Sequence, residues 1–252
     1  MTLEQLTQLV RTAHGDAWEV EGRLRVPHGG GAARVRGARL MASGIAQPRW
    51  NNADVTSEGV DLEAIGAWYA ARDLPWGMRV PLDLVVDLGT PLFVKRCVGL
   101  LPETFPRQAA SGGAIHVRPA GVAAAAAHAD LDLAVFGGEV GESRAWVGPQ
   151  IGARSHRLWV AEMDGVPVGL ATTVRSDGDA GPAAYLTGFG AVPGAPRAEV
   201  IRALVWIAVA DAFDSGATLV HANPDDDEEA GLLAGHGATE VPGFLVRVVR
   251  AT

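Results

Sequence analysis

The candidate catalytic residues of this chain are a histidine, a glutamate and a tyrosine in its C-terminal half. His221 closes a predicted strand, where an imidazole could accept a proton or orient a water molecule. Glu162 lies just before a predicted hairpin turn and could face an amine, and Tyr185 could line the pocket for that amine. The structural alternatives are a histidine bonded to backbone, a solvated carboxylate and a packed aromatic ring.

The elements that position these side chains follow one another almost without loops. Apolar patterning and turn residues predict a strand at 184–192, a Pro-Gly-Ala-Pro turn, a helix at 197–214, a strand at 217–222 and a helix at 228–235. We expect Asn223 or Asp225 to cap the last helix. A strand that leads through a tight turn into a helix N-terminus can present backbone N–H groups to an anion.

This order resembles the conserved half of the GNAT N-acyltransferase fold. In that family a strand ending in Val-Pro leads into an Arg-Gly-x-Gly-x-Gly loop around the pyrophosphate of acetyl-CoA, and the helix continues with Ala-Leu. Val192-Pro193 and Ala203-Leu204 match the two ends of this pattern. The resemblance implies acetyl-CoA or another acyl-CoA as the cofactor, and a backbone amide near Ala191 or Val192 as the oxyanion donor. The positions that it places beside the cofactor are Ala191, Val192, Arg197, Ala198, Val200, Ile201 and Asn223.

The chain departs from the GNAT pattern at two places. Every glycine of the loop is replaced; Pro196 lacks an N–H group, Glu199 brings a carboxylate, and Arg197 is the one cation there. Leu233 stands where many GNAT enzymes have a tyrosine that protonates the departing thiolate. The resemblance therefore supports the fold more strongly than the activity.

Composition narrows the classes of partner. The formal net charge of -8 over 252 residues leaves no basic patch for nucleic acid. The single cysteine, Cys97, excludes an internal disulfide, and we expect a buried thiol and no metal site. No apolar run approaches the ~18 residues of a membrane span, so we expect no membrane partner and a cytoplasmic protein.

The N-terminal half shows a weak internal repeat of the C-terminal half. Its predicted elements are a helix at 3–13, two strands between 18 and 45 joined by a glycine-rich turn, a helix at 61–73, a strand at 76–80 and a helix at 91–98. Two stretches, GIAQPRWNN and AARDLPWGMRV, resemble the N-terminal lobe of actinobacterial GNAT-like proteins. Trp50, Asn51 and Trp76 could border a cleft that faces the second lobe.

We therefore predict an α+β fold with two GNAT-like lobes, in tandem, whose mixed and mostly antiparallel sheets are flanked by helices. The predicted lobes are 1–110 and 111–252, with a linker at 106–114. In the second lobe we expect helices at 120–137 and 140–151, and a hairpin at 157–175 turning at Asp164-Gly165.

Two functions follow from the resemblance. The first is an N-acyltransferase that moves an acetyl group from CoA to a small amine-bearing metabolite. The second is a GNAT-fold protein that has lost acetyl transfer and serves as a small-molecule binding or accessory protein, or catalyses a diverted reaction. A homodimer is compatible with both, and the residues leave the choice open.

Overall fold

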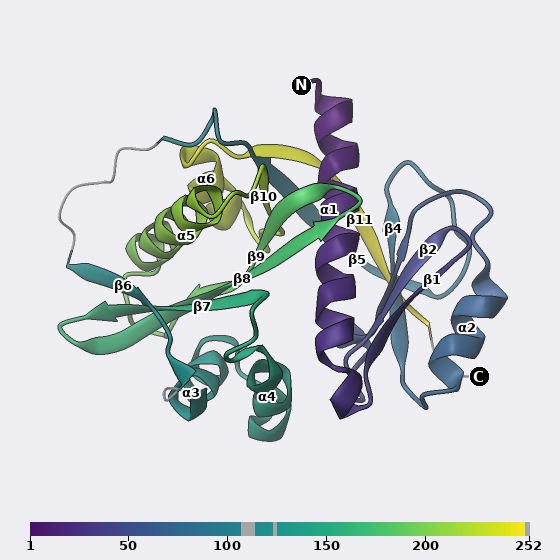
Figure 1. The fold of residues 1–252 in the computed structure, drawn as a ribbon, viewed down its shortest axis with the longest axis horizontal. Coiled ribbons are helices and arrows are strands. Elements are labelled where there is room, and N and C mark those ends of the chain that lie inside the picture. The colour runs from purple at the N-terminus through teal and green to yellow at the C-terminus, as the bar shows by residue number, and fades with distance from the viewer. Residues whose placement is uncertain (107–113, 123–124, 250–252) are drawn as a thin grey trace.

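The computed structural model describes residues 1–106, 114–122 and 125–249 (Figure 1). Its α-helices are α1 Leu3–Leu24, α2 Leu62–Ala70, α3 Ala125–Phe136, α4 Val140–Val147, α5 Arg197–Asp214 and α6 Asp227–Gly235. Its strands are β1 Gly31–Val35, β2 Ala38–Ala42, β3 Asn52–Val55, β4 Trp76–Pro81, β5 Thr90–Leu100, β6 Ile115–Pro119, β7 His156–Met163, β8 Val166–Gly178, β9 Gly181–Ala191, β10 Leu219–Ala222 and β11 Thr239–Val249. Short 3-10 helices are η1 Val26–His28, η2 Pro48–Trp50 and η4 Gly148–Gln150. Within these residues no helix is long and apolar enough to span a membrane.

The described strands form one sheet in the order β1-β2-β3-β4-β11-β5-β10-β9-β8-β7-β6. Two pairs, β3 with β4 and β9 with β10, are parallel, and the other neighbours are antiparallel. The predicted α+β architecture, with a mostly antiparallel sheet flanked by helices, is confirmed. We call the part built on β1–β4 and α2 the N-terminal lobe, and the part built on β6–β10 and α3–α6 the C-terminal lobe.

The two lobes exchange a strand. β5 follows β4 in the chain but pairs with β10 of the C-terminal lobe, whereas β11, the last described strand, pairs with β4 of the N-terminal lobe. β5 and β11 also pair with each other, so they join the two halves of the sheet (Figure 1). The division of the chain at residue 110 stays a prediction, and the linker expected at 106–114 lies almost entirely outside the described residues.

Helices cover the two faces of the sheet with different cores. On one face, α5 packs through Leu204 and Val205 against inward side chains of β9 such as Leu186. On the other face, α1 runs between the lobes and packs through Val10 against Phe244 of β11 (Figure 1). Because side chains alternate along a strand, Tyr185 of β9 faces α1 and not α5.

Several predicted elements differ from the structure. The N-terminal helix continues to Leu24, so the stretch from residue 18 onward begins as helix and the hairpin turns at Gly37 instead. Residues 91–98 lie within strand β5 and are not helical, so the helix that completed the proposed repeat is wrong. β11 was not predicted. Both strands are stabilised by pairing with distant segments, and such pairing overrides local propensity.

Other predictions are confirmed. Helix α5 covers the predicted 197–214, and the hairpin between β7 and β8 turns at Asp164 and Gly165, which both have positive φ. The cap of α6 is neither predicted residue: the side chain of Asp226 accepts a hydrogen bond from the N–H of Glu229.

Candidate binding site between the lobes

Strands β9 and β10 separate at the place where the resemblance implies an acyl-CoA. β10 pairs with β9 only as far as Leu186, while β9 continues to Ala191 with a bulge against β8. The N–H of Val192 donates to the carbonyl of Val168 (2.9 Å), so it is already occupied. The alternation of strand backbone directs the N–H of Ala191 away from β8, towards the opening.

An ion-pair cluster joins the starts of α5 and α6, the helices that follow these two strands. Arg197, the first residue of α5, pairs with Asp226 (3.0 Å), Glu229 (2.7 Å) and Glu228, all from the start of α6. The cluster ties the segment after β9 to the segment after β10. The only cation that the sequence offered to a pyrophosphate is therefore surrounded by carboxylates, which would repel phosphate.

The other expected cofactor contacts are also occupied. Val200 and Ile201 are buried in the core under α5, and the N–H of Val200 donates to Pro196 (3.0 Å). Ala198 lies in the first turn of α5, next to Arg197. Leu233 is buried in the same core. These residues do not fit the pyrophosphate of CoA.

Asn223 joins three strands. Its amide donates to the carbonyl of Arg96 (2.7 Å) and to Cys97 Sγ (3.0 Å), and its carbonyl accepts from the Tyr185 hydroxyl (2.9 Å). Burial raises the pKa of the Cys97 thiol to about 12, so the thiol stays protonated. The contacts of Asn223 are thus structural.

His221 lies in a closed core. Its ring stacks on Tyr185 (centroids 4.9 Å apart, planes at 11°) and is 6.1 Å from the ring of His14 on α1. Burial first, and then the neighbouring His14, hold the pKa of His221 well below its ordinary value, so the ring is neutral. Its Nε2 atom has no hydrogen-bond partner among the described residues. The predicted catalytic role of His221 remains a prediction, in surroundings that exclude solvent.

Glu162 lies apart from His221 and Tyr185. It is on β7 near the outer edge of the sheet, and its carboxylate accepts from Arg118 Nη2 on β6 (2.5 Å). This bond to Arg118 lowers the pKa of Glu162. Two of the three predicted catalytic residues are therefore in contact, and the third is held elsewhere.

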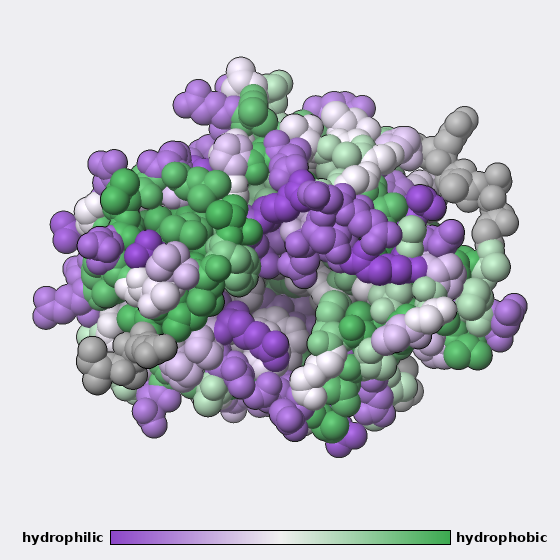
Figure 2. Space-filling model, turned by 180° about the vertical axis from the view of Figure 1, so that it is seen from behind, coloured by the Kyte–Doolittle hydropathy of each residue, from purple (hydrophilic) through white to green (hydrophobic). Residues whose placement is uncertain are grey.

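A cavity of about 280 Å³ lies between the lobes. The face shown in Figure 2 is hollowed near its middle, where the two lobes meet. Residues of α1, η2, α4, β4, β5, β9 and β11 line the cavity, and Tyr185 and Thr187 form part of the β9 wall. Of the residues predicted to border an inter-lobe cleft, Trp50 lines this cavity. Asn51 instead donates to backbone carbonyls of its own loop, and Trp76 stacks on Tyr69.

Charge in this cavity is predominantly positive. The charged side chains that line it are Arg49, Arg79, Lys95, Arg247 and Glu21. Glu21 is neutralised by Arg25 (3.0 Å) and bonded to His156 (2.9 Å), both buried. Arg79 and Lys95 were not predicted as site residues. The one available signal was that Lys95 is the only lysine of the chain.

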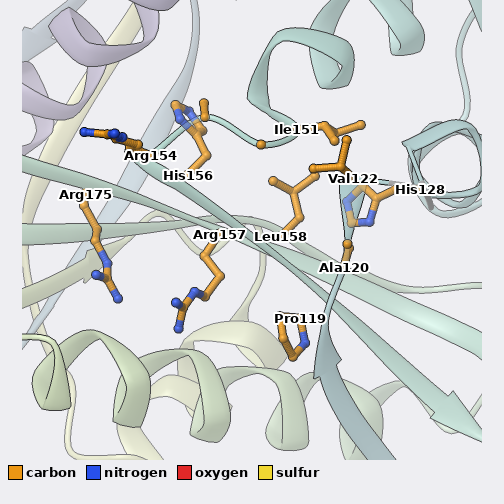
Figure 3. Close-up of a pocket in the computed structure, with 13 residues that line it drawn as sticks. Pro119, Ala120, Val122, His128, Ile151, Arg154, His156, Arg157, Leu158 and Arg175 are labelled. Carbon is orange, nitrogen blue, oxygen red and sulfur yellow. The ribbon is translucent and has the colours of Figure 1, made fainter.

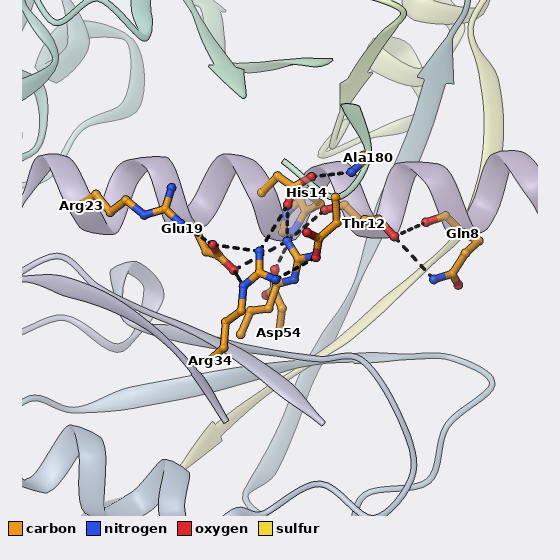
Figure 4. A network of polar contacts seen from close by, with 11 residues as sticks. Gln8, Thr12, His14, Glu19, Arg23, Arg34, Asp54 and Ala180 are labelled. Atoms are coloured by element: carbon orange, nitrogen blue, oxygen red, sulfur yellow. Dashed lines mark hydrogen bonds and ion pairs between the residues drawn. The ribbon is translucent and has the colours of Figure 1, made fainter. Parts of the chain in front are cut away.

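His14 of α1 and Asp54 of β3 belong to a polar network along α1 (Figure 4), and Asp54 also holds Arg79. His14 Nδ1 donates to Asp54 (2.9 Å), whose other oxygen accepts from Arg79 Nε, and Trp18 Nε1 donates to His14 Nε2 (3.1 Å). The Arg79 guanidinium lies 4.0 Å above the Trp18 ring. Burial lowers the pKa of His14 to about 4. Burial alone would raise the pKa of Asp54, but Arg79 and His14 hold it below its ordinary value.

A second cavity, of about 330 Å³, is lined by residues 119–122 and 151–154 and by side chains of α3, β7 and β8 (Figure 3). Arg157 and Arg175 line it, but their side chains point towards α5, where both pair with Asp211. His128 lies across the cavity from them, buried, with its Nδ1 atom unpartnered among the described residues. Arg157 and Arg175 are thus already neutralised by Asp211.

A third, acidic pocket of about 230 Å³ lies beside Gly188 at the β9 bulge. Asp132, Glu139 and Glu142 line it together with Arg49. Burial raises the pKa of Asp132, which accepts from the Ser143 hydroxyl (2.7 Å). A carboxylate with a raised pKa in a pocket can act as a general base.

Comparisons with known proteins support the fold. No protein-family model matches the sequence, and neither does any curated protein. A GCN5-related N-acetyltransferase from Kribbella flavida is similar in structure, with a TM-score of 0.69 and 16% identity over 96% of both chains. A functionally unknown conserved protein from Staphylococcus epidermidis is similar with a TM-score of 0.63 and 10% identity, over 86% of this chain and 91% of that one. A protein of Novosphingobium aromaticivorans assigned to the GNAT family is similar with a TM-score of 0.61 and 14% identity, over 97% of this chain and 99% of that one. The chain has the fold of the GNAT N-acetyltransferases.

Proposed function

We propose that this protein binds a small molecule in the cavity between its lobes, on a GNAT fold that has lost CoA-dependent acetyl transfer. The observation that carries the proposal is the ion-pair cluster at Arg197, where three carboxylates bind the cation that the resemblance places beside a pyrophosphate. A polar cavity lined by both lobes supports it, since ligand sites prefer such concave junctions.

Calorimetric titration tests whether the protein has lost the ability to bind acetyl-CoA. We expect acetyl-CoA and CoA to bind more weakly than about 0.1 mM, or not at all, because phosphate would have to displace the ion pairs of Arg197. Micromolar affinity would contradict the proposal.

A variant with a large side chain in the inter-lobe cavity tests whether ligands bind there. We expect thermal-shift screening of small organic molecules to find ligands whose stabilisation is lost in Thr187→Trp, because the indole would occupy the β9 wall of the cavity. Thr239→Trp, an exposed position at the start of β11, is the control for a general effect of the substitution. Ligands that stabilise both variants equally would bind elsewhere.

A second candidate, acyl transfer to a small amine, is favoured by the acidic pocket at the β9 bulge. Its carboxylates suit a cationic amine, and the amide of Ala191 is directed to the neighbouring opening. The test is release of free CoA from several acyl-CoA donors with a broad panel of amines. Turnover that Asp132→Asn lowers by roughly 10²-fold would establish this candidate over the first, and no release with any pair would remove it.

A further inference from the structure

We infer that the ligand of the inter-lobe cavity is a small aromatic carboxylic acid. This inference rests on the proposed function and adds the chemical class of the ligand. Three properties of the cavity carry it: an excess of positive charge, a buried guanidinium with a free donor, and walls of aromatic rings.

The first property is charge. Four cationic side chains and one carboxylate line the cavity, although the whole chain has a net charge of -8. The carboxylate, Glu21, is already bonded to Arg25, His156 and Gln150. The four cations have carboxylate partners outside the lining, but the pairs of Arg49 with Glu142 (3.5 Å), Lys95 with Asp225 (3.9 Å) and Arg247 with Asp87 (4.0 Å) are too long for strong hydrogen bonds. An anion that enters can therefore still bond to these cations, whereas a cationic ligand would be repelled.

The second property is the free donor of Arg79. This residue is 3% exposed, and its Nε atom donates to Asp54. Its Nη2 atom is buried and has no partner in the described part of the chain. Because a buried unpaired donor of a charged group is costly, a ligand carboxylate beside Arg79 would supply the acceptor that is missing.

Lys95 of β5 provides a second charge in the cavity lining. Its ion-pair partner is Asp225, 3.9 Å from the Lys95 ammonium, which is beyond hydrogen-bond distance. Burial lowers the pKa of Lys95. A bound carboxylate would therefore also stabilise the charged form of this lysine.

The third property is the aromatic wall. Three of the seven tryptophans line the cavity, together with Phe93 and Tyr185. Trp50 and Trp146 stack in parallel, 5.3 Å apart, with Arg49 over the Trp50 ring and Arg25 over the Trp146 ring. These two rings therefore present their edges to a planar ligand. A cavity of about 280 Å³ is near the lower end for organic ligands, so it suits a single ring or a fused ring pair with a short acid.

Calorimetry with matched probes tests this chemistry on the full chain. The probes are benzoate, phenylacetate and indole-3-acetate, each compared with its neutral primary amide, and with benzylamine, acetate and inorganic phosphate. We expect at least one aromatic acid to bind at least tenfold more tightly than its amide and than acetate. Equal affinity of acid and amide would overturn the role of charge, and equal affinity of aromatic acid and acetate would overturn the role of the rings.

Variants then locate the binding. We expect Lys95→Met to weaken the binding of the aromatic acid by roughly 10- to 100-fold, the range for a charge-assisted hydrogen bond. Arg96→Met is the matched control: Arg96 is the next residue, and it pairs on the opposite face with Glu240 (2.8 Å) and Asp227 (2.5 Å). Arg79→Lys, which keeps a charge beside Asp54, should weaken binding and leave the fold intact by circular dichroism. Equal losses in Lys95→Met and Arg96→Met would contradict the site.

The outcomes separate this inference from the proposed function. Tight binding of benzylamine or a neutral amide, abolished by Thr187→Trp, would overturn the acid class but keep the cavity as the site. Tight binding of inorganic phosphate alone would show a phosphate site in its place. Binding of none of the probes would overturn the inference, while the CoA titration would still test the proposed function independently.

Discussion

Replacing His128 with leucine should make the protein more resistant to acid. His128 is 2% exposed, and burial lowers the pKa of its ring to about 4. The unfolded chain takes up this proton near pH 6.5, but the folded chain does so only near pH 4. Between these values the unfolded state binds more protons, so stability falls as the pH falls. At about 1.4 kcal/mol for each pH unit, the loss attributable to His128 is about 3 kcal/mol by pH 4.

Urea denaturation at pH 7.5 and pH 4.5 measures this loss. We expect the difference in unfolding free energy between the two pH values to be smaller in His128→Leu than in the parent by about 2 to 3 kcal/mol. At pH 7.5 the variant should be at least as stable as the parent, because an unpartnered buried nitrogen is removed. The control is His116→Leu, an exposed position on β6. An unchanged pH difference in His128→Leu would show that the folded protein accommodates a charged ring there, which would refute the reasoning.

Three further predictions test other parts of the structure. Asp54→Asn should lower the unfolding free energy by about 3 kcal/mol or more in chemical denaturation, because it leaves the buried Arg79 without its counter-ion. The control is Asp83→Asn, which removes the exposed partner of Arg11 and should lower the unfolding free energy by less than ~1 kcal/mol. Arg197→Met should leave the affinity for CoA unchanged in calorimetry, because three carboxylates already occupy the guanidinium; a clear loss would mean that phosphate displaces them. Cys97 should react with iodoacetamide only after unfolding, as followed by mass spectrometry, because the thiol is buried and its pKa is raised to about 12; rapid reaction of the folded protein would contradict this.

The sequence predicted elements well where the local pattern determines them. Helix α5 has a turn before it and a buried apolar face, and the β7–β8 hairpin has Asp164-Gly165 between alternating runs. β5 was taken for a helix because FVKRCVGLL is apolar without strict alternation. Its actual state depends on β11, which lies about 140 residues further along the chain. No local pattern can indicate such a pairing.

The site was only partly predictable, for a related reason. Trp50 and Tyr185 were expected at a cleft or acceptor pocket, and both line the cavity. Arg79 was missed because a charged residue in a strand is usually exposed, and its burial depends on Asp54 and His14 from two other elements. The pairing of Arg197 with the acidic start of α6 was not predicted, because it requires two loops to meet in space.

The exchange of β5 and β11 determines how a ligand can enter and leave. Lobes joined by a linker can swing apart on a hinge and admit a ligand through a wide gap. Here much of the cavity wall belongs to strands that are hydrogen-bonded into one continuous sheet, so parting the lobes would break the β5–β11 ladder. The hollow where the lobes meet is open on the face shown in Figure 2, so a ligand can enter without separation of the lobes. We expect association rates that do not depend on a lobe-opening step.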